Sequence, residues 1–328
     1  MEWLLFLIIF FGLVFDYTNG FHDAANVVST VIATRVLAPL SAIVMAGVLN
    51  FVGATQISGV AQTIASGLID PQGTTQIVVL SAVIGAITWN LLTWYYGIPS
   101  SSSYALIGGM IGASWSHLGI DSILWKGVTE KVVLPMLISP FAGFLIGLTI
   151  MKGLFLFLHH NPDKQEHALF RHLQVGSACF VALSHGLNDA QKSMGLITLG
   201  LFSAGAITNL EIPLWVILAC AIVMGLGTAS GGFRIIRTMG FSITRINSAQ
   251  GFAAETSAST VILAASFLGM PLSSTHVIAG SITGVGAARG KTAVRWSVTQ
   301  RLIVAWVLTL PGAGTVGAIA QYLASQLL

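Results

Sequence analysis

Two short stretches place ionisable and amide side chains within strongly apolar sequence. "NGFHDAAN" covers 19–26 and follows an almost wholly apolar N-terminus, while "HGLNDAQK" covers 185–192 between two further apolar segments. A carboxylate in the middle of a membrane costs at least about 2.5–3.5 kcal/mol on insertion scales, so it is usually paired, bound to a cation or functional. Asp23 and Asp189 therefore predict a cation or proton site, although a carboxylate that caps a broken helix is an alternative.

The residues beside these acids fit the same chemistry. Asn26 lies three residues after Asp23, so the two side chains share one face of a helix, and Asn188 directly precedes Asp189. Asp and Asn oxygens are the hard ligands that Na⁺ needs, so Asp23, Asn26 and Asp189 form a candidate sodium site. Lys192 occupies in the second stretch the place of Asn26 in the first. Its ammonium could pair with Asp189, stand where a cation binds in the other half, or meet an anion.

Two further blocks carry hydroxyl groups and align with each other without gaps. They are "GIPSSSSYALIGGMIG" at 97–112 and "GMPLSSTHVIAGSITG" at 269–284. Proline and hydroxyl residues before an apolar run are typical of helix starts, whose free N–H groups carry about half a positive charge. Two such starts that converge would bind an oxyanion, whereas ordinary capping without a ligand is the alternative. The hydroxyl candidates are Ser101, Ser102, Ser103, Ser273, Ser274 and Thr275.

Four other polar residues are interpreted more simply. Glu255, in "GFAAETSAST", is an acid within an apolar segment, where a proton or cation role competes with a buried hydrogen-bonded acid. We expect Asp16 to lie near the outer end of its span and to be solvated. His22 and His276 are interpreted as packing residues without assigned chemistry.

The composition indicates where these motifs reside. The chain has 328 residues, of which 55% are hydrophobic and 8% charged, whereas a soluble domain has roughly 25% charged residues. Apolar runs near the length needed to cross the hydrocarbon layer recur throughout, so we predict an all-α polytopic membrane protein in contact with lipid. The net charge of +3 then concerns orientation, not nucleic acid. Neither H-E-x-x-H nor G-x-S-x-G occurs, so an enzyme is not expected, and no cofactor is predicted.

Ten membrane spans are predicted, five on each side of a polar segment at 159–172. The acidic motifs are expected to interrupt the first span of each half, and 58–72 and 232–247 are interpreted as half-helices or interfacial helices. The predicted spans are 3–34, 38–57, 75–97, 103–119, 132–158, 173–201, 213–231, 249–268, 274–288 and 302–326.

The basic residues suggest an orientation. With both termini outside, most of the 14 Lys and Arg residues fall on the cytoplasmic side, as the positive-inside rule expects. Lys126 and Lys131 fall outside, and Lys192 falls within a span. The cytoplasmic set is Arg35, Lys152, Lys164, Arg171, Arg234, Arg237, Arg245, Arg289, Lys291, Arg295 and Arg301.

The two motif pairs occur in the same order in each half, which indicates an internal repeat. We predict a first repeat at 1–158, a cytoplasmic linker at 159–172 and a second repeat at 173–328. Because each repeat has an odd number of spans, the two lie in opposite orientations. Inverted repeats with broken helices are typical of secondary transporters, whose substrate site lies at the midplane between the halves.

These motifs together resemble the Pit family of inorganic phosphate transporters over essentially the whole chain. The resemblance depends on "NGFHDAAN", "HGLNDAQK", the two P-x-S-S-[ST] blocks and "GFAAE". It implies low-affinity uptake of inorganic phosphate across the plasma (inner) membrane by cation symport, with alternating access and a homodimer. It also implies Na⁺ coupling in animal members, and proton coupling with acceptance of metal–phosphate complexes in many bacterial members.

The chain departs from the family pattern at three positions. The paired G-A-N-D-x-A-N signatures fall on 20–26 and 186–192, where His22 replaces the first Asn and Lys192 replaces the last. Gln62 stands where Na⁺-coupled relatives have Glu. Each change removes an oxygen ligand or an acid that Na⁺ could use, so the pattern favours protons while sodium stays open.

The sequence thus predicts an α-helical phosphate symporter in which the two hydroxyl blocks bind the anion. Asp23 and Asp189 would carry the coupling ion, H⁺ or Na⁺, assisted by Asn26, Asn188 and Glu255. The alternatives are a sulfate permease on the same scaffold, an anion channel and, less favoured, a membrane-embedded hydrolase.

Overall fold

The computed structural model describes residues 2–158 and 168–327, and within them the regular secondary structure is helical apart from one bridge between Ile69 and Ile123. The all-α prediction is confirmed, and each of the ten predicted spans contains a helix. The long helices are α1 (Glu2–Ala33), α2 (Pro39–Ala54), α4 (Gln76–Tyr95), α5 (Ser102–Leu118), α7 (Leu134–Leu158), α8 (Ala168–Ser203), α9 (Leu214–Ser230), α11 (Ser248–Phe267), α12 (Ser274–Ala287) and α13 (Trp296–Leu327). The shorter ones are α3 (Gly59–Ser66), α6 (Trp125–Val128) and α10 (Phe233–Phe241).

Four helical stretches in the described part of the chain are long and apolar enough to cross a membrane: 2–33, 76–95, 125–157 and 296–327. Two bent pairs, α2 with α3 and α9 with α10, raise this number to six if each pair crosses as one span. α5 has 17 residues and α12 has 14, which gives lengths of about 25 and 21 Å. These two helices are shorter than a hydrocarbon layer of roughly 30 Å, so neither crosses it alone, and we call α5 and α12 half-helices in this sense.

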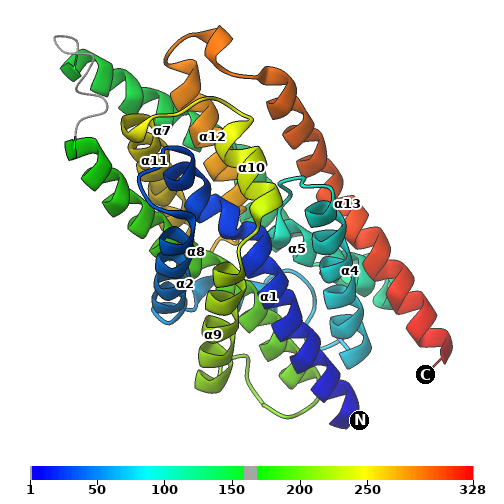
Figure 1. Cartoon of the computed structure of the whole chain (residues 1–328). Helices are drawn as coiled ribbons and strands as arrows, with labels where there is room; N and C mark the ends of the chain where they lie inside the picture. Colours follow the sequence, from blue (N-terminus) through cyan, green and yellow to red (C-terminus); the bar gives the residue numbers. More distant parts are fainter. Residues whose placement is uncertain (1, 159–167, 328) are drawn as a thin grey trace.

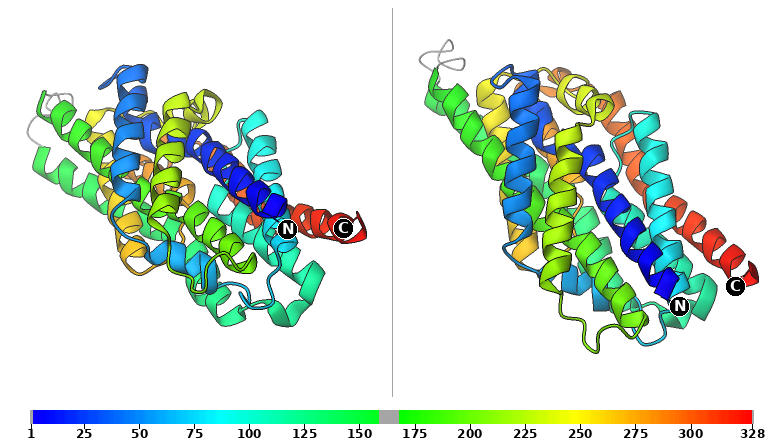
Figure 2. Two further views of the ribbon diagram at one scale, coloured as in Figure 1. Left: turned by 90° about the horizontal axis from the view of Figure 1, so that it is seen from below. Right: turned by 60° about the horizontal axis from the view of Figure 1, so that its bottom comes forward.

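The two halves run in opposite directions, as α1 and α8 show (Figure 1). Gly12 of α1 faces Ile197, whereas at the other end of the pair Thr34 donates a hydrogen bond to Gln174 at 2.9 Å. The numbers of the contacting residues therefore rise along α1 as they fall along α8, so the two helices are antiparallel. The N- and C-termini lie at the same end of the molecule (Figure 2).

Equivalent bends recur in both halves. α3 turns from α2 by 70° and α10 turns from α9 by 69°. Gly97 and Gly269 lie two residues after the ends of α4 and α11, and their φ angles of +64° and +63° are favourable only for glycine. After each glycine the next N–H bonds back into the helix, from Ile98 to Thr93 and from Met270 to Ala265, at 2.9 Å in both cases. These caps turn the chain sharply into the two hydroxyl blocks.

The half-helices pack on the last helix of the opposite half. α5 lies against α13, and α12 lies against α7. A Cβ at Gly108 or Gly112 would overlap the α13 backbone, and one at Gly280 or Gly284 would overlap the α7 backbone. Glycines four residues apart let helix backbones approach closely within a membrane. Each predicted repeat therefore completes its packing with a helix from the other.

The predicted interruption of α1 and α8 by the acidic motifs is wrong, because both helices continue through them. Gly20 packs on the α9 backbone at Thr228, and Gly186 packs on the α2 backbone at Asn50. These glycines serve close packing and do not break the helix. Of the predicted linker at 159–172, residues 159–167 lie outside the described part, and 168–172 belong to α8.

We predict that Gly284→Val lowers the melting temperature of the detergent-purified protein. The added side chain must displace the α7 backbone at Phe144, and overpacking of this kind costs about 1–3 kcal/mol. Gly153→Val is the matched control, because a Cβ at Gly153 meets no atom of the described residues within 4 Å. Equal melting temperatures for the two variants would contradict the close α7–α12 contact.

Candidate functional site

The four sequence motifs converge at the centre of the molecule. The middle of α1 meets the start of α12, and the middle of α8 meets the start of α5, so that each acidic motif faces the hydroxyl block of the opposite half. The two helix starts also meet each other. Ser103 Oγ donates to the Leu272 carbonyl at 2.8 Å, and the rings of Tyr104 and His276 lie 5.1 Å apart. The four motifs therefore lie together, and a shared pocket between them stays a prediction.

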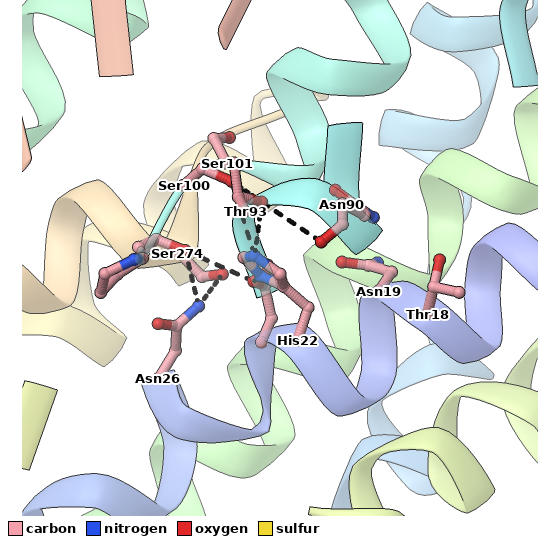
Figure 3. Close-up of polar contacts among 12 residues, drawn as sticks. Thr18, Asn19, His22, Asn26, Asn90, Thr93, Ser100, Ser101 and Ser274 are labelled. Atoms are coloured by element: carbon pink, nitrogen blue, oxygen red, sulfur yellow. Dashed lines mark hydrogen bonds and ion pairs between the residues drawn. The ribbon is translucent and has the colours of Figure 1, made fainter. Parts of the chain in front are cut away.

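The first acidic motif binds the second hydroxyl block. Asn26 Nδ2 donates to Ser274 Oγ at 3.1 Å and to Thr275 Oγ1 at 2.9 Å (Figure 3). Thr275 Oγ1 also lies 3.5 Å from Asp23 Oδ1. The amide and the hydroxyls therefore place the Asp23 carboxylate beside the N-terminus of α12.

The second acidic motif binds the first hydroxyl block through a lysine. The Lys192 ammonium donates to Asp189 Oδ1, to Ser103 Oγ and, at 2.8 Å, to the Leu272 carbonyl. Lys192 and Asp189 are both 0% exposed. An internal ion pair thus occupies in this half the position that Asn26 and Asp23 occupy in the other.

The hydroxyl groups divide into different roles. Ser101 and Ser273 are the N-caps of α5 and α12, where their Oγ atoms accept from the N–H groups of Tyr104 and His276. The capping predicted for both blocks is therefore present. Several buried polar atoms around the same point have no hydrogen-bond partner among the described residues; they include Ser102 Oγ, Asn26 Oδ1, Asp189 Oδ2 and Asn19 Oδ1. Buried polar groups are normally satisfied, so this concentration indicates a polar ligand site.

Histidines lie closer to the acids than the sequence suggested. His22 Nδ1 is 2.6 Å from Asp23 Oδ1, and His185 Nε2 is 3.3 Å from Asp189 Oδ2. Ligand atoms of Asp23, His185 and Asp189 lie within 4.8 Å of one another, so the two motifs meet directly. The interpretation of His22 as a packing residue is incomplete, whereas His276 does pack, stacked on Trp306 at 4.1 Å between ring centroids.

Asn188 positions the connection between α11 and α12. Its Oδ1 accepts from the Leu272 N–H at 3.1 Å, and its Nδ2 donates to Ser266 Oγ at 3.0 Å and to the Met270 carbonyl at 3.2 Å. All of these contacts are within the protein. The structure therefore gives Asn188 a positioning role beside Asp189, and a role as an ion ligand stays a prediction.

Glu255 lies in a separate polar cluster. Its carboxylate accepts from Thr30 Oγ1 at 2.6 Å, from Gln174 Nε2 at 3.1 Å and from Ser177 Oγ. Thr30 is one helical turn beyond Asn26 on α1, so the cluster adjoins the central site along that helix. Glu255 is 0% exposed and hydrogen-bonded by three donors, and its coupling role stays a prediction.

The expectation that Asp16 is solvated is wrong. Asp16 is 0% exposed, and its Oδ1 accepts from Ser193 Oγ of α8 at 2.7 Å. Burial follows from the antiparallel packing of α1 on α8, which brings residues far apart in sequence together. Asp16 lies on the same face of α1 as Asp23, two turns earlier, a spacing that the sequence does show. Gln62 is exposed on α3, where its amide donates to Ser66 Oγ at 3.4 Å.

Two antiparallel sets of helices that bring buried acids and helix N-termini together at their centre are typical of membrane transporters. The sequence model of the family described as "Phosphate transporter family" matches residues 19–168 and 157–317 of this chain. The chain therefore belongs to this family. The prediction of the family from the sequence motifs is confirmed.

Several relatives carry the same description, "Probable low-affinity inorganic phosphate transporter". The Mycobacterium bovis protein is 45% identical over 96% of this chain and 76% of its own length. The Bacillus subtilis protein is 41% identical over 99% of this chain and 98% of its own length. A solved structure titled "The sodium-dependent phosphate transporter" superposes with a TM-score of 0.91 at 25% identity and covers all of both chains. These names agree with a transport protein, as the sequence predicts, and not an enzyme.

We predict that Lys192→Met destabilises the protein. The substitution leaves the Asp189 carboxylate buried without its ammonium partner, and breaking a buried pair in this way costs about 3–5 kcal/mol. The double variant Lys192→Met/Asp189→Asn should recover part of the lost melting temperature, because it removes both charges. A single variant as stable as the wild type would contradict the ion pair.

Proposed function

We propose that this protein imports inorganic phosphate by cation symport. The observation that carries the proposal is the meeting of two hydroxyl-capped helix N-termini with two buried acids at one point. The family and its relatives' names support phosphate as the substrate. Uptake into the cell across the plasma membrane, with both termini outside, is part of the proposal.

The phosphate oxygens would bind between the starts of α5 and α12. Helix N-termini supply free N–H groups and a positive potential, and the hydroxyls of Ser102, Ser274 and Thr275 add donors. Ser101 and Ser273 accept with their oxygens as caps, so their hydroxyl hydrogens are free to donate. Ser103 would join this set of donors by exchanging its bond to the Leu272 carbonyl for one to phosphate. The Lys192 ammonium, whose three hydrogens already have partners, would add positive charge, so no guanidinium group is needed.

Phosphate is favoured over sulfate by the position of Asp23. HPO₄²⁻ carries a proton that it can donate to a carboxylate, whereas SO₄²⁻ carries none. Asp23 lies beside Thr275 at the cradle, so its carboxylate can accept from the phosphate and would repel an unprotonated dianion.

The coupling ion would bind at Asp23 and Asp189, and a proton is favoured over Na⁺. The ammonium of Lys192 already pairs with Asp189. The second acidic motif therefore offers a metal ion no carboxylate without a positive partner. The cluster of Asp23, His185 and Asp189 includes an imidazole, whereas Na⁺ prefers oxygen ligands. Asp23, Asn26 and Asp189 remain the oxygen set for the sodium alternative, and Asn188 and Glu255 are proposed to assist either ion.

Transport would follow from charge compensation. The coupling cation and the two positive helix ends offset the charge of the phosphate dianion at the midplane. A site that holds both ions can then turn from one side of the membrane to the other at a lower desolvation cost. Alternating access between the two inverted halves is the proposed motion. A homodimer and the acceptance of metal–phosphate complexes are further parts of this proposal.

Ser102→Ala and Ser274→Ala should each raise the phosphate concentration for half-maximal uptake by about tenfold or more. Each removes a hydrogen bond to a charged ligand, which contributes about 1.5–3 kcal/mol. Ser116→Ala is the matched control, because Ser116 lies at the other end of α5 and is exposed. Unchanged half-saturation in both site variants would count against the cradle.

Asp23→Asn should abolish gradient-driven uptake without loss of folded protein. Asp189→Asn should also abolish it, but with a lower melting temperature, because the substitution leaves the buried Lys192 ammonium without its carboxylate partner. Phosphate uptake into proteoliposomes, with Na⁺ and pH gradients imposed separately, measures this directly. We expect the pH gradient to drive wild-type uptake. Uptake that continues without any ion gradient would instead support an anion channel, and sulfate that competes as well as arsenate would support a sulfate permease.

A further inference from the structure

We propose that Asp16, Asn19 and Asn90 form a further cation site for a hard monovalent ion such as Na⁺, separate from the central site of Asp23 and Asp189. The three side chains are 0% exposed. None of them belongs to the candidate ion or phosphate sets described above. The inference goes beyond the proposed symport and does not depend on it.

Asp16 is a buried acid with little compensation. In the described part of the chain, Asp23 contacts an imidazole, Asp189 pairs with an ammonium and Glu255 accepts from three donors, whereas Asp16 forms no ion pair. Its Oδ1 accepts one hydrogen bond, from Ser193 Oγ, and its Oδ2 has no partner among the described residues. An isolated buried carboxylate is costly, so this group must hold a proton or a bound cation.

Two neighbouring amides favour the cation. Asn19 Oδ1 and both side-chain polar atoms of Asn90 have no hydrogen-bond partner within the residues that the structure describes. Together with Asp16 Oδ2, this leaves three oxygens that need a positive partner. One proton on Asp16 would supply a donor to only one of the two amide oxygens, whereas a cation can bind all three oxygens.

The helices that carry these residues pack side by side. A Cβ at Gly200 of α8 would meet both Ile8 of α1 and Val79 of α4, so the three helices are in contact there. Further along, His22 of α1 contacts Thr93 of α4 at 3.2 Å. Residue numbers therefore rise together along α1 and α4, which run in the same direction, with α8 against both.

This register brings the three oxygens together. Asn19 and Asn90 each lie three residues before the contact between α1 and α4 at 3.2 Å, and Figure 3 shows Asn19 pointing from α1 toward α4. Asp16 lies three residues before Asn19, on the same face of α1. The bond of Asp16 to Ser193 and the 3.5 Å contact of Asn19 Nδ2 with the Asp189 carbonyl turn that face toward α8. The oxygens therefore surround the space where α1, α4 and α8 meet.

The donor set selects the kind of ion. Carboxylate and amide oxygens suit hard cations, and this set contains neither an imidazole nor a thiol. One carboxylate balances a single positive charge, whereas a divalent ion would leave an excess charge buried. A bound Na⁺ would thus do for Asp16 what the Lys192 ammonium does for Asp189. It would also hold three helices together two turns of α1 away from Asp23.

The test follows the melting temperature of the detergent-purified protein, without phosphate, as NaCl replaces choline chloride at constant ionic strength. Above half-saturation, each tenfold rise in Na⁺ should raise the wild-type melting temperature by roughly 2–4 °C. Asp16→Asn, which keeps the size of the side chain, should lose this shift, and so should Asn90→Leu, which removes an oxygen. Asp121→Asn, which changes an exposed acid outside these three helices, is the matched control and should keep the shift.

Several results would overturn the inference. One is a wild-type melting temperature that does not respond to Na⁺, which would leave a proton on Asp16. Another is a shift that Asp16→Asn retains. Loss of the shift in Asp23→Asn would place the ion at the central site instead and would equally overturn the inference.

Equilibrium dialysis with radioactive Na⁺ keeps the inference testable if one site variant does not fold. The other site variant should then bind one Na⁺ fewer than the wild type, and equal binding would contradict the site. Neither measurement involves phosphate uptake. A failure of the proposed symport would therefore leave both outcomes unchanged.

Discussion

The constraint on which the structure depends is that charges buried between α1 and α8 must be compensated within the protein. Asp23 and Asp189 lie where two antiparallel helices cross, with 2% and 0% of their surfaces exposed. One is bonded to an imidazole and the other to an ammonium. The short half-helices α5 and α12 add their positive ends at the same point. Helix packing, N-capping and ion pairing therefore all contribute positive charge or positive potential around the two buried carboxylates. A bound anion would change the net charge of this site.

The two halves reach this balance with different residues. Lys192 pairs with Asp189 in the second half, whereas His22 contacts Asp23 in the first half. An exact repeat would compensate both acids alike. The asymmetry pairs Asp189 with an ammonium and Asp23 with an imidazole, so the two halves of the site are not equivalent.

Much of this arrangement could be predicted from the sequence, because its signals are local. Gly97, Pro99 and the hydroxyls after them specify a helix end and a helix start whatever surrounds them, and the matching block at 269–284 reveals the repeat. The acids stand out because the neighbouring residues are so apolar. The continuity of α1 and α8 was missed, since it depends on Gly20 and Gly186 meeting the backbones of other helices. The burial of Asp16 by Ser193 and the contact of His22 with Thr93 join residues from separate helices, which one sequence without an alignment does not pair.

The packing of each half-helix on the last helix of the opposite half also affects the order in which the chain can fold. The glycine face of α5, at Gly108 and Gly112, stays uncovered until α13 has left the ribosome, because its partner backbone lies near the end of the chain. The first half therefore cannot reach its final packing as an autonomous folding unit during translation. The start of α5, which carries the first hydroxyl block, therefore reaches its final packed position only after the last helix of the chain has been made.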